Sequence, residues 1–138
     1  MSLESRVRAI SMMRRVSEIE RLHELYRLRA RSAERDRELA LSEGHLAAAD
    51  TKPELLYLSS IQLSLAGIRR NQAVDLAQSV AVLEREIIRI ESRIKVLDEL
   101  SRATKHEIQR ADDRARLVEM LDLFVSRRIY DESREVLR

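Results

Sequence analysis

The clearest pattern in the sequence is a run of aliphatic residues whose spacings alternate between three and four. The run consists of Ala73, Leu76, Val80, Leu83, Ile87, Ile90, Ile94 and Leu97. Residues at these spacings form a single stripe along an α-helix, and such a stripe packs against a partner helix in coiled coils. The sequence therefore predicts a long helix with a buried seam from Ala73 to Leu97, and this seam requires a second helix.

A cluster of helix-breaking residues divides the chain near residue 50. Thr51 and Glu54 have the spacing of a capping box, and Pro53 is tolerated in the first turn of a helix. We expect one helix at about 3–49, a turn at about 50–53 and a second helix at about 54–137. A connection this short makes neighbouring helices antiparallel. The predicted fold is all-α, a single coiled-coil domain over residues 1–138, formed by an antiparallel two-helix hairpin with a longer second helix.

The apolar pattern of the first helix is less regular. Its apolar residues recur every three positions, at Ile10, Met13, Val16, Ile19, Leu22, Leu25 and Leu28. This line wraps around the helix, with Met12, Tyr26, Ala30 and Ala33 on one side and Leu3, Ile10, Leu28 and Leu39 on another. One face is expected to pack on the second helix. The other is either a partner surface or part of the apolar fraction of any protein surface.

A second stripe precedes the seam of the second helix. It consists of Leu58, Ile61, Leu65 and Ile68. The stripe is out of phase with the seam by about one residue, which predicts a local unwinding of the supercoil. Gly67 lies at this predicted phase break.

The seam weakens after residue 100, and apolar residues return towards the C-terminus. This segment contains Leu117, Val118, Met120, Leu121, Leu123, Phe124, Val125, Ile129 and Tyr130. The first helix is too short to cover these residues, so we expect them to be exposed. An exposed apolar patch of this kind is typical of a contact with a partner protein or of self-association.

Composition supports an elongated helical protein and limits its partners. Charged residues make up 36% and aromatic residues 3%, which favours a thin aliphatic seam over a compact core. The net charge of +2 does not indicate nucleic acid as a partner, and the arginine-rich segment from Arg6 to Arg37 fits a solvated helix face. The absence of cysteine suits a reducing cytoplasm. No segment approaches the roughly 20 apolar residues that span a membrane, so no membrane insertion is expected.

Candidate chemistry is sparse. Glu20 and His23 have the Glu-x-x-His spacing of a di-iron ligand pair, but neither His45 nor His106 completes a second pair. There is no glycine-rich phosphate loop in the sequence. We therefore expect no catalytic residues, no metal and no cofactor, and the chain is not predicted to be an enzyme.

Two segments resemble a known family. The segment Ile94–Leu100 is similar to a basic and apolar K-x-L-E-x-L stretch, and Glu119–Asp122 with Arg127 and Arg128 is similar to an L-D-E segment followed by basic residues. Leu123 stands where the last acidic residue of that segment is expected. These features resemble the FliJ family of flagellar type III export, including its YscO-type injectisome relatives. The resemblance implies an antiparallel coiled coil similar to the central stalk of rotary ATPases.

The resemblance also implies partners. One is a hexameric export ATPase, whose central hole would contact Arg114, Arg116, Leu117, Met120, Leu121, Phe124, Arg127 and Arg128. A second is the cytoplasmic domain of the export gate, which would contact Tyr57, Ile61 and Leu65, with Ile61 in place of an aromatic residue. Alternatively, Ile61 and Leu65 belong to the seam between the helices. Export chaperones are a further candidate partner, and the implied location is cytoplasmic, peripheral to the inner-membrane export apparatus.

The functional expectation is a non-catalytic stalk or coupling factor that links the export ATPase to the export gate. The alternative is a generic coiled-coil adaptor or a chaperone-like hairpin that binds other proteins. A nucleic-acid-binding arm is a third class, but acidic residues lie between the arginines throughout the first helix. No nucleic acid partner is therefore expected.

Overall fold

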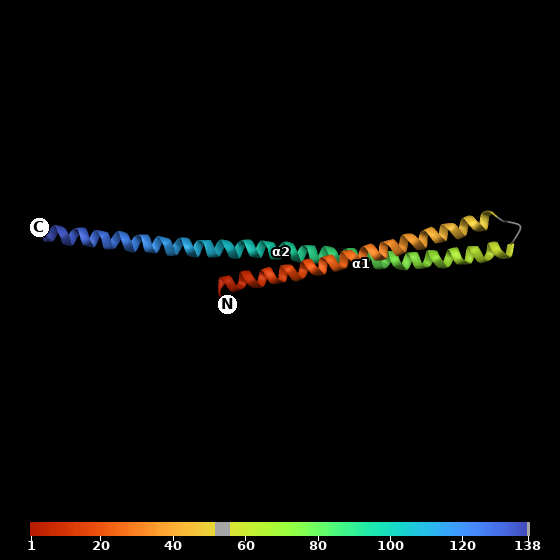
Figure 1. Cartoon of the computed structure of the whole chain (residues 1–138), viewed down its shortest axis with the longest axis horizontal. Coiled ribbons are helices and arrows are strands. Elements are labelled where there is room, and N and C mark those ends of the chain that lie inside the picture. The colour runs from red at the N-terminus through yellow and green to blue at the C-terminus, as the bar shows by residue number, and fades with distance from the viewer. Residues whose placement is uncertain (52–55, 138) are drawn as a thin grey trace. The chain divides into compact units, whose positions relative to one another are not determined.

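The computed structural model describes residues 1–51 and 56–137. These residues form two α-helices, α1 from Leu3 to Thr51 and α2 from Leu56 to Val136, and there is no strand within the described ranges (Figure 1). The all-helical class and the longer second helix are as predicted. Of the expected turn at 50–53, Asp50 and Thr51 belong to α1. The capping box depends on Glu54, which lies outside the described residues.

Both helices run through a glycine without interruption. Gly44 lies inside α1 and Gly67 inside α2, and neither has a positive φ. A single glycine inside a helix costs about 1 kcal/mol relative to alanine, which long helices with otherwise favourable residues tolerate. Gly44 therefore does not end the first helix.

The chain divides into two compact units. The terminal unit contains Met1–Arg14 and Lys95–Arg138, and the central unit contains Arg15–Ile94. Each unit thus takes one part of α1 and one part of α2. We describe the two units in turn.

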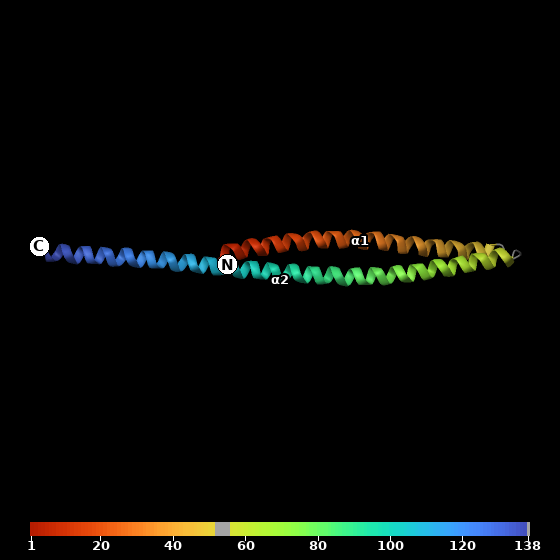
Figure 2. The same ribbon diagram turned by 90° about the horizontal axis from the view of Figure 1, so that it is seen from below.

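In the central unit, α1 lies beside the first part of α2 (Figures 1 and 2). Residues that follow one another in α1 contact residues that come progressively earlier in α2. The contacts are Glu20 with Arg93, Arg21 with Glu91, Glu38 with Arg69, Ser42 with Ala66, His45 with Gln62 and Ala49 with Ser59. Within this unit the two helices therefore run side by side over most of their length.

The aliphatic seam predicted for α2 is buried. Ala73, Val80, Leu83, Ile87, Ile90 and Ile94 are buried in the central unit, Leu97 is buried in the terminal unit, and Leu76 is half-buried. Burial of a large aliphatic side chain contributes about 1.5–3 kcal/mol. The seam prediction is confirmed, and this row of side chains is the main source of packing energy.

The predicted phase break near Gly67 is wrong. From Ala73 towards the N-terminus of α2, the buried or half-buried positions continue at spacings of four and three through Arg69, Ala66, Gln62 and Ser59. The seam keeps its phase because small and polar residues fill it. The apolar stripe at Leu58, Ile61 and Ile68 consequently faces solvent, and only Leu65 is half-buried.

The α1 side of the seam in the central unit is largely polar. Ser17 and Ser42 are buried, and Arg21, Glu24, Leu28, Arg35, Glu38 and His45 are half-buried. Long arginine side chains can cover apolar surface with their aliphatic stems while the charged group stays in water. Most of the apolar line of α1, including Val16, Ile19 and Leu22, is exposed.

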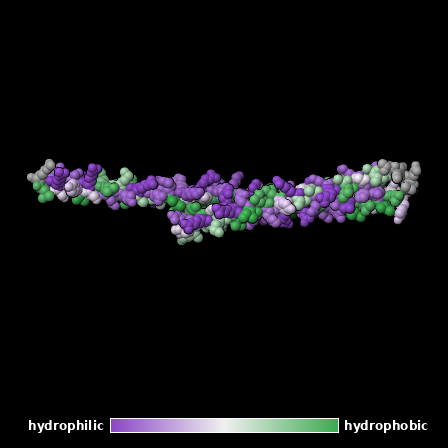
Figure 3. Space-filling model, in the orientation of Figure 1, coloured by the Kyte–Doolittle hydropathy of each residue, from purple (hydrophilic) through white to green (hydrophobic). Residues whose placement is uncertain are grey.

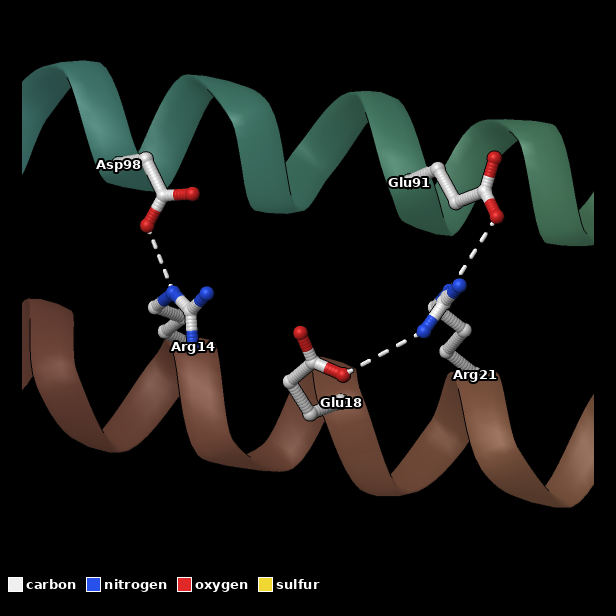
Figure 4. Close-up of polar contacts among 5 residues, drawn as sticks. All are labelled: Arg14, Glu18, Arg21, Glu91 and Asp98. Atoms are coloured by element: carbon white, nitrogen blue, oxygen red, sulfur yellow. Dashed lines mark hydrogen bonds and ion pairs between the residues drawn. The ribbon is translucent and has the colours of Figure 1, made fainter.

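Ion pairs join the two sides of the seam (Figure 4). In the central unit, Arg21 Nε lies 3.2 Å from Glu91 Oε1, and Arg21 Nη1 lies 3.7 Å from Glu18 Oε2. In the terminal unit, Arg14 Nε donates to Asp98 Oδ1 at 2.6 Å. Glu91 and Asp98 of α2 thus each bond to an arginine of α1.

In the terminal unit, only the first part of α2 is buried against α1. Leu3, Val7 and Ile10 of α1 are half-buried, as are Ser101, Thr104 and Ile108 of α2. Every residue from 109 to 137 is exposed. In Figure 3 this part of α2 shows a hydrophilic stretch followed by hydrophobic residues near its C-terminal end. The expected exposure of the C-terminal apolar segment is confirmed.

Candidate functional site

The C-terminal segment of α2 presents an apolar face to solvent. Leu117, Met120, Leu121 and Phe124 occupy positions i, i+3, i+4 and i+7, which places them on one side of the helix. All four are exposed, and Phe124 is 63% exposed. Large side chains that remain accessible on a regular helix are available for a protein contact. The structure therefore brings together the four apolar residues of the predicted ATPase-ring contact.

Basic residues bracket this face along the same side of the helix. Arg114 lies one turn before Leu117, and Arg128 lies one turn after Phe124. Arg128 Nε is 3.5 Å from Glu132 Oε1 in an exposed ion pair, which contributes little to stability. Arg116 and Arg127 are exposed beside the face. All eight predicted ring-contact residues are thus accessible, and the apolar ones share one face.

Some apolar residues of this segment were not assigned to the predicted ring contact. Leu123, Val125, Ile129 and Tyr130 are exposed in the same segment. Helical geometry turns them away from the side that carries Leu121 and Phe124, so they extend the apolar surface around the helix. A shallow hollow on α2 is lined by Phe124, Arg127, Arg128 and Asp131.

The predicted gate-contact residues lie near the start of α2 in the central unit. Tyr57 is 78% exposed and Ile61 is 39% exposed, whereas Leu65 is half-buried. Of the two alternatives for Ile61, the seam assignment is not supported, because Gln62 occupies the seam position. Ile68, which the sequence assignment omitted, is exposed on the same side of α2 as Tyr57 and Ile61.

Glu20, one residue of the candidate metal pair, forms an ion pair with α2. Glu20 Oε2 accepts a hydrogen bond from Arg93 Nη1 at 3.0 Å, and His23 is exposed. Within the described ranges, no group of three or more His, Asp or Glu side chains is placed to hold a metal ion. Over the same residues, neither helix includes a stretch long and apolar enough to cross a membrane.

Comparisons with protein-family models, curated proteins and solved structures give no significant match for this chain.

Proposed function

We propose that the chain is a non-catalytic stalk or coupling factor of a bacterial type III protein export apparatus, where it links a hexameric export ATPase to the export gate. The observation that carries the proposal is the exposed apolar face at Leu117, Leu121 and Phe124, bracketed by Arg114 and Arg128. This face coincides with the segment that resembles the C-terminal part of the FliJ family. Its location is then cytoplasmic, peripheral to the inner-membrane export apparatus.

We infer an antiparallel coiled-coil hairpin, supported by the order of the contacts in the central unit. Contacts of Arg21 with Glu91, of Ser42 with Ala66 and of His45 with Gln62 advance along α1 while they go back along α2. Stiffness and end-specific contacts are the properties that a coupling rod needs.

The proposed ATPase contact combines two kinds of interaction. Side chains near the centre of an interface contribute most when they fill pockets from which water is excluded. Arginines at the rim steer association towards an acidic surface and make its rate depend on salt. We therefore assign affinity to Leu121 and Phe124, and orientation in the ring to Arg114 and Arg128.

The proposed gate contact uses the exposed side at the start of α2. Tyr57 and Ile61 supply an aromatic and an aliphatic group one helical turn apart. Leu65 is half-buried, so its contribution is smaller than the sequence suggests, and Ile68 is the better placed aliphatic neighbour. Export chaperones would compete for this exposed stripe if they bind the chain.

The proposal is tested with the purified full-length chain, the export ATPase and the cytoplasmic domain of the gate from the same bacterium. Phe124→Glu should weaken ATPase binding at least tenfold, a change of about 1.4 kcal/mol, and leave gate binding unchanged. Ile61→Glu should have the opposite effect. Ile88→Glu, at a position that is 61% exposed and outside both surfaces, is the matched control and should alter neither.

The outcome of this double test separates the two functional classes. A coupling factor needs two separate surfaces, one for each partner. A substitution in one surface should therefore abolish binding to one partner and leave binding to the other intact. If the unmodified chain binds neither protein, the coupling proposal is wrong and the generic adaptor or chaperone-like hairpin becomes the better assignment. If Phe124→Glu retains full ATPase binding, the ring contact lies elsewhere on the chain.

A further inference from the structure

A second stripe runs along the outer side of α1 in the central unit. Its positions alternate in spacing between three and four, like those of the α2 seam. The stripe consists of Val16, Ile19, His23, Tyr26, Ala30, Ala33, Arg37, Ala40, Gly44 and Ala47. Every one of these residues is exposed, and only His23 and Arg37 carry strongly polar side chains. We call this set the outer stripe.

The outer stripe lies opposite the side of α1 that faces α2. Ile19 precedes the half-buried Arg21 by two residues, and Tyr26 precedes the half-buried Leu28 by two, which corresponds to a rotation of about 200° around a helix. The side towards α2 is the more polar of the two, since it contains Ser17 and Arg21. If α1 packed only on α2, its apolar residues would be expected on the side that faces α2. They lie instead on the outer stripe.

We propose that the outer stripe is a dimer interface, in which α1 packs antiparallel against α1 of a second copy of this chain. The register places Val16 against Ala33, Ile19 against Ala30 and His23 against Tyr26 of the second copy. A coiled-coil stripe with core spacing requires a partner helix, and in this register the stripe residues from Val16 to Ala33 of the two copies cover one another. The chain itself supplies a helix with the same stripe, and a two-fold axis makes such a surface complementary to itself.

Side-chain size supports the antiparallel direction. The large residues Val16 and Ile19 begin the outer stripe, and the small residues Ala30 and Ala33 lie at its middle. Antiparallel pairing sets each large residue against a small one, which fills helix interfaces evenly. Parallel pairing would instead set Ile19 on Ile19 and Ala30 on Ala30, and would place Arg37 of each copy against the other.

The charges beside the outer stripe support the same register. The arrangement that pairs Ile19 with Ala30 also sets Arg15 against Asp36 and Glu20 against Arg27 of the second copy. Pairs of opposite charge at these flanking positions select direction and register in coiled coils more than they add affinity. Within one chain, Asp36 Oδ1 lies 3.2 Å from Arg35 Nη2, and Glu20 Oε2 lies 3.0 Å from Arg93 Nη1. The second copy would therefore extend existing ion pairs.

The neighbouring antiparallel registers, one heptad away, bring like charges together. In one of them Arg15 faces Arg29 and Glu20 faces Glu20 of the second copy. In the other, Glu20 faces Glu34 and Arg27 faces Arg27. Like charges in direct opposition are destabilising. The flanking charges therefore disfavour these two registers, but not the register two heptads away, in which Arg27 faces Glu34 and Arg29 faces Asp36 of the second copy.

The first test is the oligomeric state of the full chain, measured by sedimentation equilibrium over a range of concentrations. We expect a reversible monomer–dimer equilibrium. Ile19→Glu should raise the dimer dissociation constant at least about tenfold, because two charges per dimer enter the interface. Ile88→Glu is the matched control: Ile19 is 67% exposed and Ile88 is 61% exposed, so neither substitution disturbs the packing of the single chain. A chain that stays monomeric at about millimolar concentration would overturn the proposal, as would an unaffected Ile19→Glu dimer.

The second test fixes the direction and register by disulfide trapping, because the chain contains no cysteine of its own. Mixing a Val16→Cys chain with an Ala33→Cys chain should give a covalent dimer of the two different chains under mild oxidation. Neither chain alone should do so efficiently, since the two Val16 positions would lie about 25 Å apart along the helix axis. Trapping of Val16→Cys with itself would overturn the antiparallel arrangement.

Charge reversal provides an independent check on the same register. Arg15→Asp should weaken the dimer, and Arg15→Asp combined with Asp36→Arg should restore it. The outer stripe shares no residue with the proposed ATPase and gate contacts. Dimerisation and the coupling function can therefore fail separately, and a dimer without ATPase binding would support this inference while it argues against the proposed function.

Discussion

Ser42 Oγ donates a hydrogen bond to the backbone oxygen of Ala66 at 3.0 Å, and both residues are buried between α1 and α2. Two small residues therefore face each other at this point of the seam. Ser42→Leu should lower the free energy of unfolding by about 1–3 kcal/mol, because the extra carbon atoms do not fit between the helices. Urea unfolding measures the change. Ser64→Leu is the control, since Ser64 is exposed on α2 and the same substitution there should have little effect.

Two isoleucines of α2 that lie two positions apart, Ile88 and Ile90, give the sharpest test of the seam. Ile90 is 3% exposed and Ile88 is 61% exposed. Ile90→Ala should cost about 2–4 kcal/mol of stability through lost burial and the cavity that it leaves. Ile88→Ala should cost less than about 0.5 kcal/mol, as for other surface substitutions. Equal losses of thermal stability for the two variants would refute the assignment of the seam.

Gly67 should tolerate alanine with a gain in stability. The residue lies inside α2 without a positive φ, and apart from its chain neighbours and the nearby backbone of its own helix, a Cβ atom there meets no atom within 4 Å. Gly67→Ala should therefore raise the free energy of unfolding by about 0.5–1 kcal/mol, because alanine restricts the unfolded chain more than glycine does. A rise in melting temperature checks this, and a loss would mean that Gly67 approaches another surface closely.

The ion pair between Arg21 and Glu91 should contribute modestly. Arg21 Nε and Glu91 Oε1 lie 3.2 Å apart; the Arg21 side chain is half-buried and the Glu91 side chain is exposed. Glu91→Gln should cost no more than about 1 kcal/mol, and the difference from the unmodified chain should shrink as salt is raised. Unfolding at low and high ionic strength provides the measurement. A large, salt-independent loss would show that Glu91 is held in an environment less open to water.

The sequence predicted the fold where aliphatic residues alone define the seam, and it failed where polar residues do. From Ala73 to Leu97 the heptad spacing identified the buried side directly. Before Ala73 the seam passes through Gln62 and Ser59. Their neighbours Leu58 and Ile61 are more hydrophobic, so an apolar pattern selected the wrong side of α2.

The same limit applies to α1. Arg14 and Arg21 face α2 and bond to Asp98 and Glu91, which hydrophobicity cannot indicate. Residues such as Ile19 are exposed although they are among the most apolar of the helix. By contrast, the exposure of Leu117 and Phe124 could be predicted, because comparing the two helix lengths shows that α1 cannot cover them.

The last prediction concerns a chain that ends after Gln109. Residues beyond Ile108 are all exposed in the terminal unit, so their removal takes away little packing energy. The shortened chain should unfold at nearly the same temperature as the full chain. A chain that ends after Ser101 is the control, since it also loses the half-buried Thr104 and Ile108 and should be less stable.

The same pair of truncations separates folding from function. If Leu117–Tyr130 holds the ATPase contact, the chain that ends after Gln109 should be folded by circular dichroism and yet fail to bind or stimulate the ATPase. Its binding to the gate domain through Tyr57 and Ile61 should persist, because these residues lie in the central unit. Full ATPase binding by the shortened chain would move the contact away from α2's C-terminal segment. The exposed apolar residues of α1, such as Ile19, would then be the next surface to test.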